Sequence, residues 1–422
     1  MKAEVKRPFI ISKQSVWQSY ISMKANRGSA GVDEVSIQEF DKDLKDNLYK
    51  LWARLSSGSY MPPPVRLVEI DKPEGGKRPL GIPTVSDRIA QGVVKQALEG
   101  AMDKLFHKDS YGYRPKKSAL EAVGICRQRC WQYDWVLDLD IKGFFDNIPH
   151  DLMMKAVEKH TNCKWHLLYI KRWLAAPLQD KDGKQYERTK GTPQGSVISP
   201  LLANLFLHYC LDLWMVRHYP YCPFERYADD MIIHCKTVME AQKLKEEIGN
   251  RLQECGLQMH PEKTKIVYCK DAKRGGNYEN VTFDFLGYGF HPRRSRNLRG
   301  VQFVAFTPAI SKKACKRIGE EIRKSKQLKL SNNDLSDISS ELNLKVRGWI
   351  NYYGKYCRSK LFQSVLHQLD LRIARWAKRK YKRLKGNMLS GIDWMEKMRK
   401  AEPFQFEHWW LYRESPRIIR AV

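Results

Sequence analysis

Alternating apolar and polar residues predict short strands through the first two thirds of the chain. The pattern predicts single strands at residues 135–141, 263–268 and 282–290, and hairpins at residues 176–188 and 224–235. The strand predicted at 65–70 leads into a turn at residues 73–76, so Lys72 and Arg78 are expected to flank a hairpin tip. Helical spacing of apolar residues predicts helices at residues 87–106, 146–160 and 238–255. Residues 1–60 are typical of polar helices with a break at 27–31, and from residue 307 onward helices are expected almost throughout. We therefore expect an α+β protein followed by an α-helical module.

The longest apolar stretch, residues 197–216, is expected to be a buried helix and not a membrane span. It contains Pro200, Asn204, His208 and Asp212, which are costly in a bilayer. The first ten residues lack the apolar run of a secretory signal. None of the ten cysteines forms a CxxC pair, and no histidine stands at zinc-ligand spacing. We therefore expect reduced, mostly buried thiols and a cytoplasmic protein without a membrane partner.

The charge distribution indicates a polyanionic partner. The 422 residues include 75 Lys and Arg against 47 Asp and Glu, a formal net charge of +28. Residues 291–422 hold 31 Lys and Arg against 11 Asp and Glu, so +20 of this charge lies in the last third. Aromatic residues are interleaved with the basic ones there, which favours backbone neutralisation combined with base stacking over a merely solubilising surface. Nucleic acid is the expected partner.

Two acidic clusters stand where carboxylates are costly. In the strand predicted at 135–141, Asp138 and Asp140 share one face, and the other face is apolar. Asp229 and Asp230 are adjacent at the tip of the second predicted hairpin, where their repulsion calls for a cation. A solvated turn would explain either cluster alone, but together they favour Mg²⁺ bound by carboxylates. Asp140 and Asp229 could then hold two ions about 3.5–4 Å apart, as in-line phosphoryl transfer requires.

Three motifs in order resemble those of reverse transcriptases. Tyr227-Ala228-Asp229-Asp230 resembles the YxDD box, and Asp140-Ile141-Lys142-Gly143-Phe144-Phe145-Asp146 is similar to the first catalytic motif. The segment from Gly191 to Asn204, with Pro193-Gln194-Gly195, resembles the PQG motif and its helix. YADD alone is a weak signal, but the three motifs at this spacing are highly specific.

Further segments narrow the resemblance to group II intron-encoded reverse transcriptases. Gly348-Trp349-Ile350-Asn351-Tyr352-Tyr353 resembles their maturase motif, and residues 27–33 and 81–88 also match, so the likeness covers almost the whole chain. It implies a right-hand polymerase fold with fingers, palm and a basic helical thumb. We expect an N-terminal extension at 1–60, fingers and palm at 61–300, a thumb and maturase domain at 301–385, and a short tail at 386–422.

The resemblance implies roles for the acidic residues and for those around the incoming nucleotide. Asp140, Asp229 and Asp230 would be the catalytic metal ligands for two Mg²⁺ ions, with Mn²⁺ as a possible substitute. Asp138 shares the strand face of Asp140, so it could support these ligands, but we do not expect it to be a primary ligand. Nucleotide-binding roles would fall to Lys72, Arg78, Phe145, Gln194, Gly195 and Lys263. Lys72 and Arg78 would contact the triphosphate, Phe145 would exclude a 2′-hydroxyl, and Lys263 would protonate pyrophosphate. Ser196 departs from the family, in which a second glycine is common, and this leaves the local backbone conformation open.

The remaining predicted site residues would contact nucleic acid. Leu286, Gly287 and Tyr288 resemble the primer grip, which seats the primer end. The C-terminal third would bind the template–primer duplex and the intron RNA through aromatic and basic residues, namely Trp349, Tyr352, Tyr353, Lys378, Arg379, Lys380, Lys382 and Arg383. A solvated helix face is the alternative for the basic run. No Cys/His-rich nuclease segment follows the thumb motif, so we expect no endonuclease domain and a borrowed primer, such as a nascent strand at a replication fork.

The leading hypothesis is an RNA-directed DNA polymerase that also acts as a maturase. It would bind its group II intron RNA, assist splicing, and use dNTPs to copy the intron into a DNA target (retrohoming) in the bacterial cytoplasm. One alternative is an RNA-binding splicing factor with little polymerase activity, which the intact Asp140, Asp229, Asp230 and Gln194 disfavour. Another is a host-adopted reverse transcriptase for repair or defence, and the maturase motif disfavours the defence role.

Overall fold

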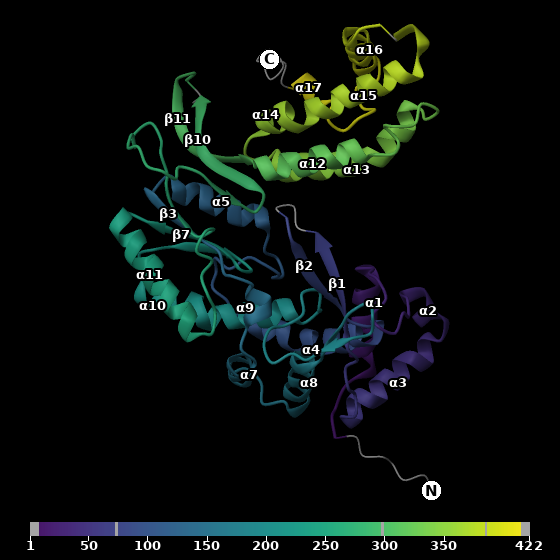
Figure 1. Cartoon of the computed structure of the whole chain (residues 1–422), viewed down its shortest axis with the longest axis vertical. Coiled ribbons are helices and arrows are strands. Elements are labelled where there is room, and N and C mark those ends of the chain that lie inside the picture. Colours follow the sequence, from purple (N-terminus) through teal and green to yellow (C-terminus); the bar gives the residue numbers. More distant parts are fainter. Residues whose placement is uncertain (1–7, 72–74, 297–298, 385, 415–422) are drawn as a thin grey trace. The chain divides into compact units, whose positions relative to one another are not determined.

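The computed structural model describes residues 8–71, 75–296, 299–384 and 386–414, and the chain divides into two compact units. The first unit combines Met1–Ala122 with Leu137–Ile266, and the second combines Val123–Val136 with Val267–Val422. Each unit contains both helices and sheet, which confirms the expected α+β class (Figure 1). The ten cysteines all lie among the described residues and form no disulfide, and seven of them are buried, in line with their expected place in the core.

Three helices open the first unit: α1 (Lys13–Ala25), α2 (Ile37–Lys42) and α3 (Leu44–Ser57). Local sequence sets their ends. The Ser12 hydroxyl caps α1 by accepting from the Ser15 N–H at 3.0 Å, and Ser36 with Glu39 forms a capping box on α2. Gly58 ends α3 at a φ of 75°. The expected break therefore spans residues 26–36, longer than predicted.

A four-stranded sheet of the first unit contains the predicted hairpin near residue 70. Its order is β2-β1-β4-β5, and the register of β1 on β2 runs from Arg66↔Ile82 to Asp71↔Lys77. Helix α4 (Val85–Asp103) follows; Thr84 caps it, and it begins two residues before the expected start at residue 87. The strands are β1 (Val65–Asp71), β2 (Lys77–Ile82), β4 (Leu178–Gln179) and β5 (Gln185–Tyr186).

A second sheet has the order β6-β7-β3-β8. It contains the predicted acidic hairpin, and the division between the two units passes through β3, β8 and α5. The strands are β3 (Trp135–Leu139), β6 (Phe224–Tyr227), β7 (Asp230–Cys235) and β8 (Lys265–Tyr268). The accompanying helices are α5 (Ala119–Cys130), α6 (Phe144–Asn147), α7 (His150–Glu158), α8 (Lys164–Ala175) and α11 (Val238–Glu254).

The long apolar segment is helical and largely buried, as expected, but one turn interrupts its α-helical geometry. Helix α9 (Ser199–Leu207) passes into a π-helical turn, η1 (His208–Asp212), and continues as α10 (Leu213–His218). Asp212 ends the π turn and is fully buried. In the part of the chain that the structure describes, no helix is both long and apolar enough to span a membrane.

A three-stranded sheet of the second unit corrects one sequence prediction. The strand expected at 282–290 is two strands, β9 (Phe283–Phe285) and β10 (Tyr288–Arg296), because Leu286 and Gly287 take φ values of 51° and 79° and reverse the chain. The sheet order is β11-β10-β9. Strand β11 (Gln302–Ile310) also delays the helical region, which begins at Lys312 and not at 307.

The helices of the second unit surround a core rich in aromatic residues. The fully buried Trp376 packs on Tyr381 and Trp394, with ring centroids 6.2 and 6.1 Å away. Phe406 and Trp409, near the end of the described chain, are also buried. The helical elements are α12 (Lys312–Lys324), α13 (Leu335–Tyr353), α14 (Arg358–Leu361), η2 (Phe362–Leu366), α15 (His367–Lys380), η3 (Lys382–Leu384), α16 (Met388–Ala401) and α17 (Leu411–Glu414).

Candidate active site

The YADD segment forms the tight turn between β6 and β7. Tyr227 pairs with Asp230 across the hairpin, so Ala228 and Asp229 are its two central residues. Ala228 has a φ of 57°, in the left-handed region that hairpin turns of this length use at their first central position. The turn therefore places Asp229 at the tip and Asp230 at the first position of β7.

Asp140 follows directly after β3, the neighbour of β7 in the sheet. The segment from Gln258 to Thr264 fixes its backbone. The His260 N–H donates to the Asp140 carbonyl at 2.8 Å, and the Thr264 hydroxyl lies 3.3 Å from both the amide and the carbonyl of Asp140. The adjacent strand ends thus bring Asp140 to the same edge of the sheet as the Asp229–Asp230 turn.

The three carboxylates interact electrostatically. Burial raises the pKa of Asp229, and repulsion from Asp140 adds to this. Desolvation by the surrounding protein raises the pKa of Asp230 to about 6, and the charges of Asp229 and Asp140 raise it further. The charges of Lys263 and Arg78 oppose this shift. The Asp230 side chain is itself exposed, and a bound cation would reverse the repulsion between the carboxylates. Three converging carboxylates are hard oxygen ligands, and this donor set fits a divalent cation such as Mg²⁺.

Arg78 connects the β1–β2 hairpin to the PQG loop. Its Nε donates to Gln194 Oε1 at 2.5 Å, and the Gly81 N–H donates to the Gln194 carbonyl at 2.7 Å. Gly195 has a φ of 112°, and a Cβ there would lie 2.5 Å from the Gly81 carbonyl oxygen, so glycine is required. Arg78, Gln194 and Gly195 therefore lie together, whereas Lys72 falls outside the described residues.

Phe145 adjoins the same loop. Its carbonyl accepts from the Thr192 N–H at 2.7 Å, and its ring meets Phe144 edge-on with centroids 5.3 Å apart. Gly191 allows this approach, because a Cβ there would lie 2.7 Å from the Asp146 carbonyl oxygen. The Phe145 side chain is 7% exposed, so only a small part of the ring is available to a ligand.

A buried polar network, which we did not predict from the sequence, supports the PQG loop. Gln91 on α4 accepts at Oε1 from the Ser196 hydroxyl at 2.7 Å and from the Val197 N–H at 2.8 Å. Asp87 in turn accepts from the Gln91 amide at 2.9 Å and from Trp173 Nε1 at 2.7 Å. Ser196 therefore supplies a hydroxyl that a second glycine would lack. The signal in the sequence was Asp87 and Gln91, four residues apart on an otherwise apolar helix face.

Tyr113 is a second residue beside the carboxylates that sequence reasoning missed. Its side chain is 54% exposed, and its ring lies 6.3 Å from that of Tyr227. Burial raises its pKa, and the charge of Asp229 raises it further. Tyr113 also has a positive φ of 55°, which is uncommon for a bulky residue and concentrates at functional sites. An exposed aromatic ring in this place can contact a base or sugar.

In the second unit, the segment predicted as the primer grip is a two-residue hairpin turn. Leu286 and Gly287 are its central residues, and Tyr288 begins β10. The Tyr352 hydroxyl donates to the Leu286 carbonyl at 2.8 Å, and the Tyr288 hydroxyl donates to the Tyr352 carbonyl. A Cβ on Gly287 would lie 3.0 Å from the Tyr353 hydroxyl. The maturase motif therefore packs directly on this turn.

The structure separates the predicted nucleic-acid contacts of the second unit into packed and exposed side chains. Tyr353 is buried and accepts from Arg317 at 3.0 Å, whereas Trp349 and Tyr352 are partly exposed. Lys380 donates to the Asn333 carbonyl at 2.6 Å and pairs with Asp334, and Arg379 donates to the Leu328 carbonyl. Lys378 is half-buried, and Lys382 and Arg383 are exposed.

A basic hollow between α12 and α15 was not predicted. It has a volume of about 330 Å³, and Arg323, Arg372 and Arg375 are among its lining residues. Partial burial lowers the pKa of Arg372, and repulsion from Arg375 and Arg323 lowers it further. Clustered guanidinium groups of this kind favour a phosphate-bearing ligand. Their i, i+3 spacing on α15 was the available signal in the sequence.

Comparison with known protein families agrees with the motifs. Residues 70–290 match the reverse transcriptase (RNA-dependent DNA polymerase) family, and residues 315–390 match the maturase-specific domain of group II introns. The first match covers about half of the chain and contains Asp140, Asp229 and Asp230. The second contains the Gly348–Tyr353 motif and all five of the predicted basic contacts.

Individual similar proteins agree with these two family matches. Protein YkfC of Escherichia coli is 31% identical over 304 residues, which cover 63% of this chain and 77% of YkfC. Group II intron-encoded protein LtrA of Lactococcus lactis is 33% identical over 203 residues, 47% of this chain and 33% of LtrA. The putative COX1/OXI3 intron 1 protein of Saccharomyces cerevisiae is 33% identical over 168 residues, covering 40% of this chain and 20% of that protein. The chain thus spans only a third or less of these two intron-encoded relatives.

The family matches and the relatives imply a right-hand polymerase fold that binds nucleic acid and uses divalent metal ions. The edge of the β6-β7-β3-β8 sheet supplies three carboxylates suited to such ions, and the β1–β2 hairpin and PQG loop complete a site beside them. The chain belongs to the reverse transcriptase family of RNA-directed DNA polymerases and is a group II intron-type reverse transcriptase/maturase.

Proposed function

We propose that this chain copies group II intron RNA into DNA with Asp140, Asp229 and Asp230 as the ligands of two Mg²⁺ ions. The observation that carries the proposal is the convergence of these carboxylates at one sheet edge, with the charges of Arg78 and Lys263 opposing their repulsion. When bound, the two ions would neutralise charge on the attacking and leaving oxygens of nucleotidyl transfer. Mn²⁺ has the same preference for oxygen ligands and could substitute.

Side chains of the chain would orient the other reactants. Arg78, held by Gln194, would bind dNTP phosphates, and Gly195 would let the loop backbone approach the nucleotide. The exposed part of Phe145 would limit room for a 2′-hydroxyl. Lys263, exposed next to the Thr264 hydroxyl that holds Asp140, would donate a proton to the departing pyrophosphate. Lys72 would add a second cation for the triphosphate.

We further propose that the second unit binds the primer end, the template–primer duplex and the intron RNA. The turn at Leu286, Gly287 and Tyr288 would seat the primer, and the exposed Lys382 and Arg383 would contact phosphates. Selective binding of the spliced fold of the RNA would give the maturase activity, and DNA synthesis at a DNA target would give mobility. Ten cysteines without a disulfide suit action in a reducing cytoplasm. The proposed domain bounds are 1–60, 61–300, 301–385 and 386–422.

Primer extension tests the proposal. Purified protein is incubated with an RNA template, a DNA primer and Mg²⁺, and incorporation of dNTPs is compared with that of NTPs. Asp229→Ala serves as the site variant, and Asp138→Asn, on the same strand face as Asp140, serves as the matched acidic control. Template-dependent DNA synthesis that Asp229→Ala abolishes and Asp138→Asn retains is expected. Tight, salt-sensitive RNA binding without DNA synthesis would instead favour a splicing factor with little polymerase activity.

A further inference from the structure

A fully buried arginine lies directly before the YADD turn. Arg226 is on β6 and has no exposed surface. Its Nε and one terminal nitrogen donate to the two carboxylate oxygens of Asp212, at 2.7 and 2.6 Å. This is the bidentate geometry in which a guanidinium pairs most strongly with a carboxylate, and it holds the planar group in one orientation.

The other terminal nitrogen of Arg226 faces the turn. It donates to the Ala228 carbonyl at 2.9 Å and to Asn204 Oδ1 at 3.0 Å. The Asn204 amide in turn donates to the Gly112 carbonyl at 2.7 Å. Gly112 lies so close to the turn that a Cβ there would be 2.3 Å from the Ala228 nitrogen. One guanidinium thus connects α9, the π turn and the Gly112 segment to the residue before Asp229.

This arrangement matches what the turn needs. Ala228 is held at a φ of 57°, and a non-glycine residue keeps such a conformation only where its surroundings over-determine it. A buried ion pair contributes little to stability compared with apolar residues of equal volume. The buried Arg226–Asp212 pair is therefore better explained by its effect on the orientation of the Ala228 carbonyl than by general stabilisation of the core.

We infer that Arg226, oriented by Asp212, is a positioning residue that fixes the Ala228 turn and thereby directs Asp229 and Asp230 toward the metal ions. The inference rests on the proposed function of those two aspartates. Arg226 acts only through the turn, because its guanidinium is fully buried and bonded to Asp212, Asn204 and Ala228.

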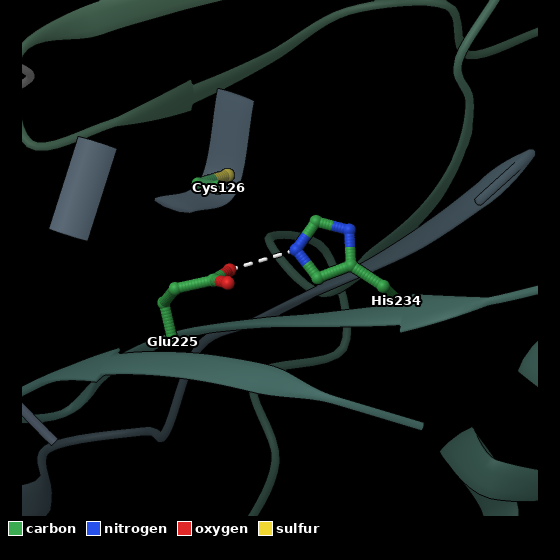
Figure 2. Close-up of side chains that lie close together, drawn as sticks. All are labelled: Cys126, Glu225 and His234. Carbon is green, nitrogen blue, oxygen red and sulfur yellow. Dashed lines mark hydrogen bonds and ion pairs between the residues drawn. The ribbon is translucent and has the colours of Figure 1, made fainter. Parts of the chain in front are cut away.

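The opposite face of the hairpin offers a matched control. Glu225 precedes Arg226 on β6, so its side chain points the other way, and its carboxylate pairs with His234 Nε2 at 2.7 Å (Figure 2). Both residues are fully buried. Glu225→Gln therefore perturbs a buried charged contact of the same hairpin but leaves the Ala228 carbonyl and its donor in place.

The experiment compares Arg226→Lys with Glu225→Gln and the wild-type chain. A lysine ammonium cannot reproduce the planar fork that reaches Asp212, Asn204 and Ala228 together. We expect Arg226→Lys to lower kcat for primer extension about a hundredfold, since misplacement of about 1 Å costs this much. We also expect it to raise the Mg²⁺ concentration for half-maximal rate at least fivefold and to speed amide hydrogen exchange in residues 227–230. Glu225→Gln should leave the Mg²⁺ dependence unchanged.

The outcomes separate this inference from the proposed function. DNA synthesis by the wild-type chain that is lost in Asp229→Ala supports the proposed function, and the inference about Arg226 is tested only after that. A folded Arg226→Lys variant with wild-type kcat, Mg²⁺ dependence and exchange would then overturn the inference alone, as would an equal rise in Mg²⁺ requirement in Glu225→Gln. If Arg226→Lys does not fold, Asn204→Ala, which leaves the Arg226–Asp212 pair intact, must raise the Mg²⁺ requirement in the same direction, and an unchanged value would refute the inference.

Discussion

Substituting Gly195 with alanine tests the contact between the PQG loop and the β1–β2 hairpin. The added Cβ would lie 2.5 Å from the Gly81 carbonyl oxygen, whereas real Cβ atoms essentially never approach closer than 3.0 Å. The loop and the hairpin must therefore separate by at least 0.5 Å, the difference between these two distances. The residue would also keep a φ of 112°, which costs about 1–3 kcal/mol for a side chain with a Cβ.

The separation should affect catalysis more than stability. Arg78 is on the displaced hairpin, and its bond to Gln194 crosses the contact that opens. Since a 1 Å misplacement of a reacting group costs about a hundredfold in rate, a shift of half that size should lower kcat/KM for dNTPs about tenfold. Steady-state primer extension measures this value, and thermal unfolding measures the stability of the same preparation.

Gly183→Ala is the matched control. Gly183 also has a positive φ, 82°, but a Cβ there meets nothing within 4 Å. Both variants therefore carry a backbone penalty, and only Gly195→Ala forces two segments apart. If the two variants have the same kcat/KM for dNTPs, the close approach of Gly195 to Gly81 has no role in nucleotide binding.

Two further predictions concern stability and RNA binding. Burial raises the pKa of Asp87 to about 6, so its contribution to stability is complete below about pH 4 and is lost as the pH rises through 6. The stability advantage of the wild-type chain over Asp87→Asn, measured by urea unfolding, should therefore shrink by about 2.5 kcal/mol between pH 4 and pH 7, and a constant difference would contradict this. Replacing Arg372 or Arg375 with glutamine should weaken RNA binding and reduce the salt slope by about 1, measured by filter binding. Arg347→Gln, which alters an exposed residue paired with Glu407, is the control, and an equal loss there would show that the hollow is not a specific site.

The pattern of apolar residues predicted most helices and strands, because the buried face of each element sets the spacing of its apolar residues. The strand predicted at 65–70, the acidic hairpin and the helix at 238–255 all lie within one or two residues of the observed bounds. The acidic residues were also predictable as a site, because adjacent carboxylates between apolar strands need a counter-charge.

The missed features depend on contacts between distant segments. The strand predicted at 282–290 reads as continuous, and only the packing of Tyr352 on Leu286 shows why the chain reverses there. Arg226 and Asp212 are charged residues within apolar segments, which signals pairing, but nothing in their spacing identifies the partner. Ser196 could not be interpreted without Gln91, which is 105 residues away in the chain.

The π turn at His208–Asp212 has a consequence for changes in chain length. Such a turn holds one residue more than an α-helical turn, so it absorbs that residue and leaves the flanking helices nearly in the register of an uninterrupted helix one residue shorter. Without the turn, and at the same chain length, Asp212 would be rotated by about 100° relative to Asn204, since an α-helix has 3.6 residues per turn. Arg226 needs both residues at once. Deleting one residue within the turn should therefore be tolerated by the polymerase, whereas deleting a second residue, which no extra turn residue can absorb, should not.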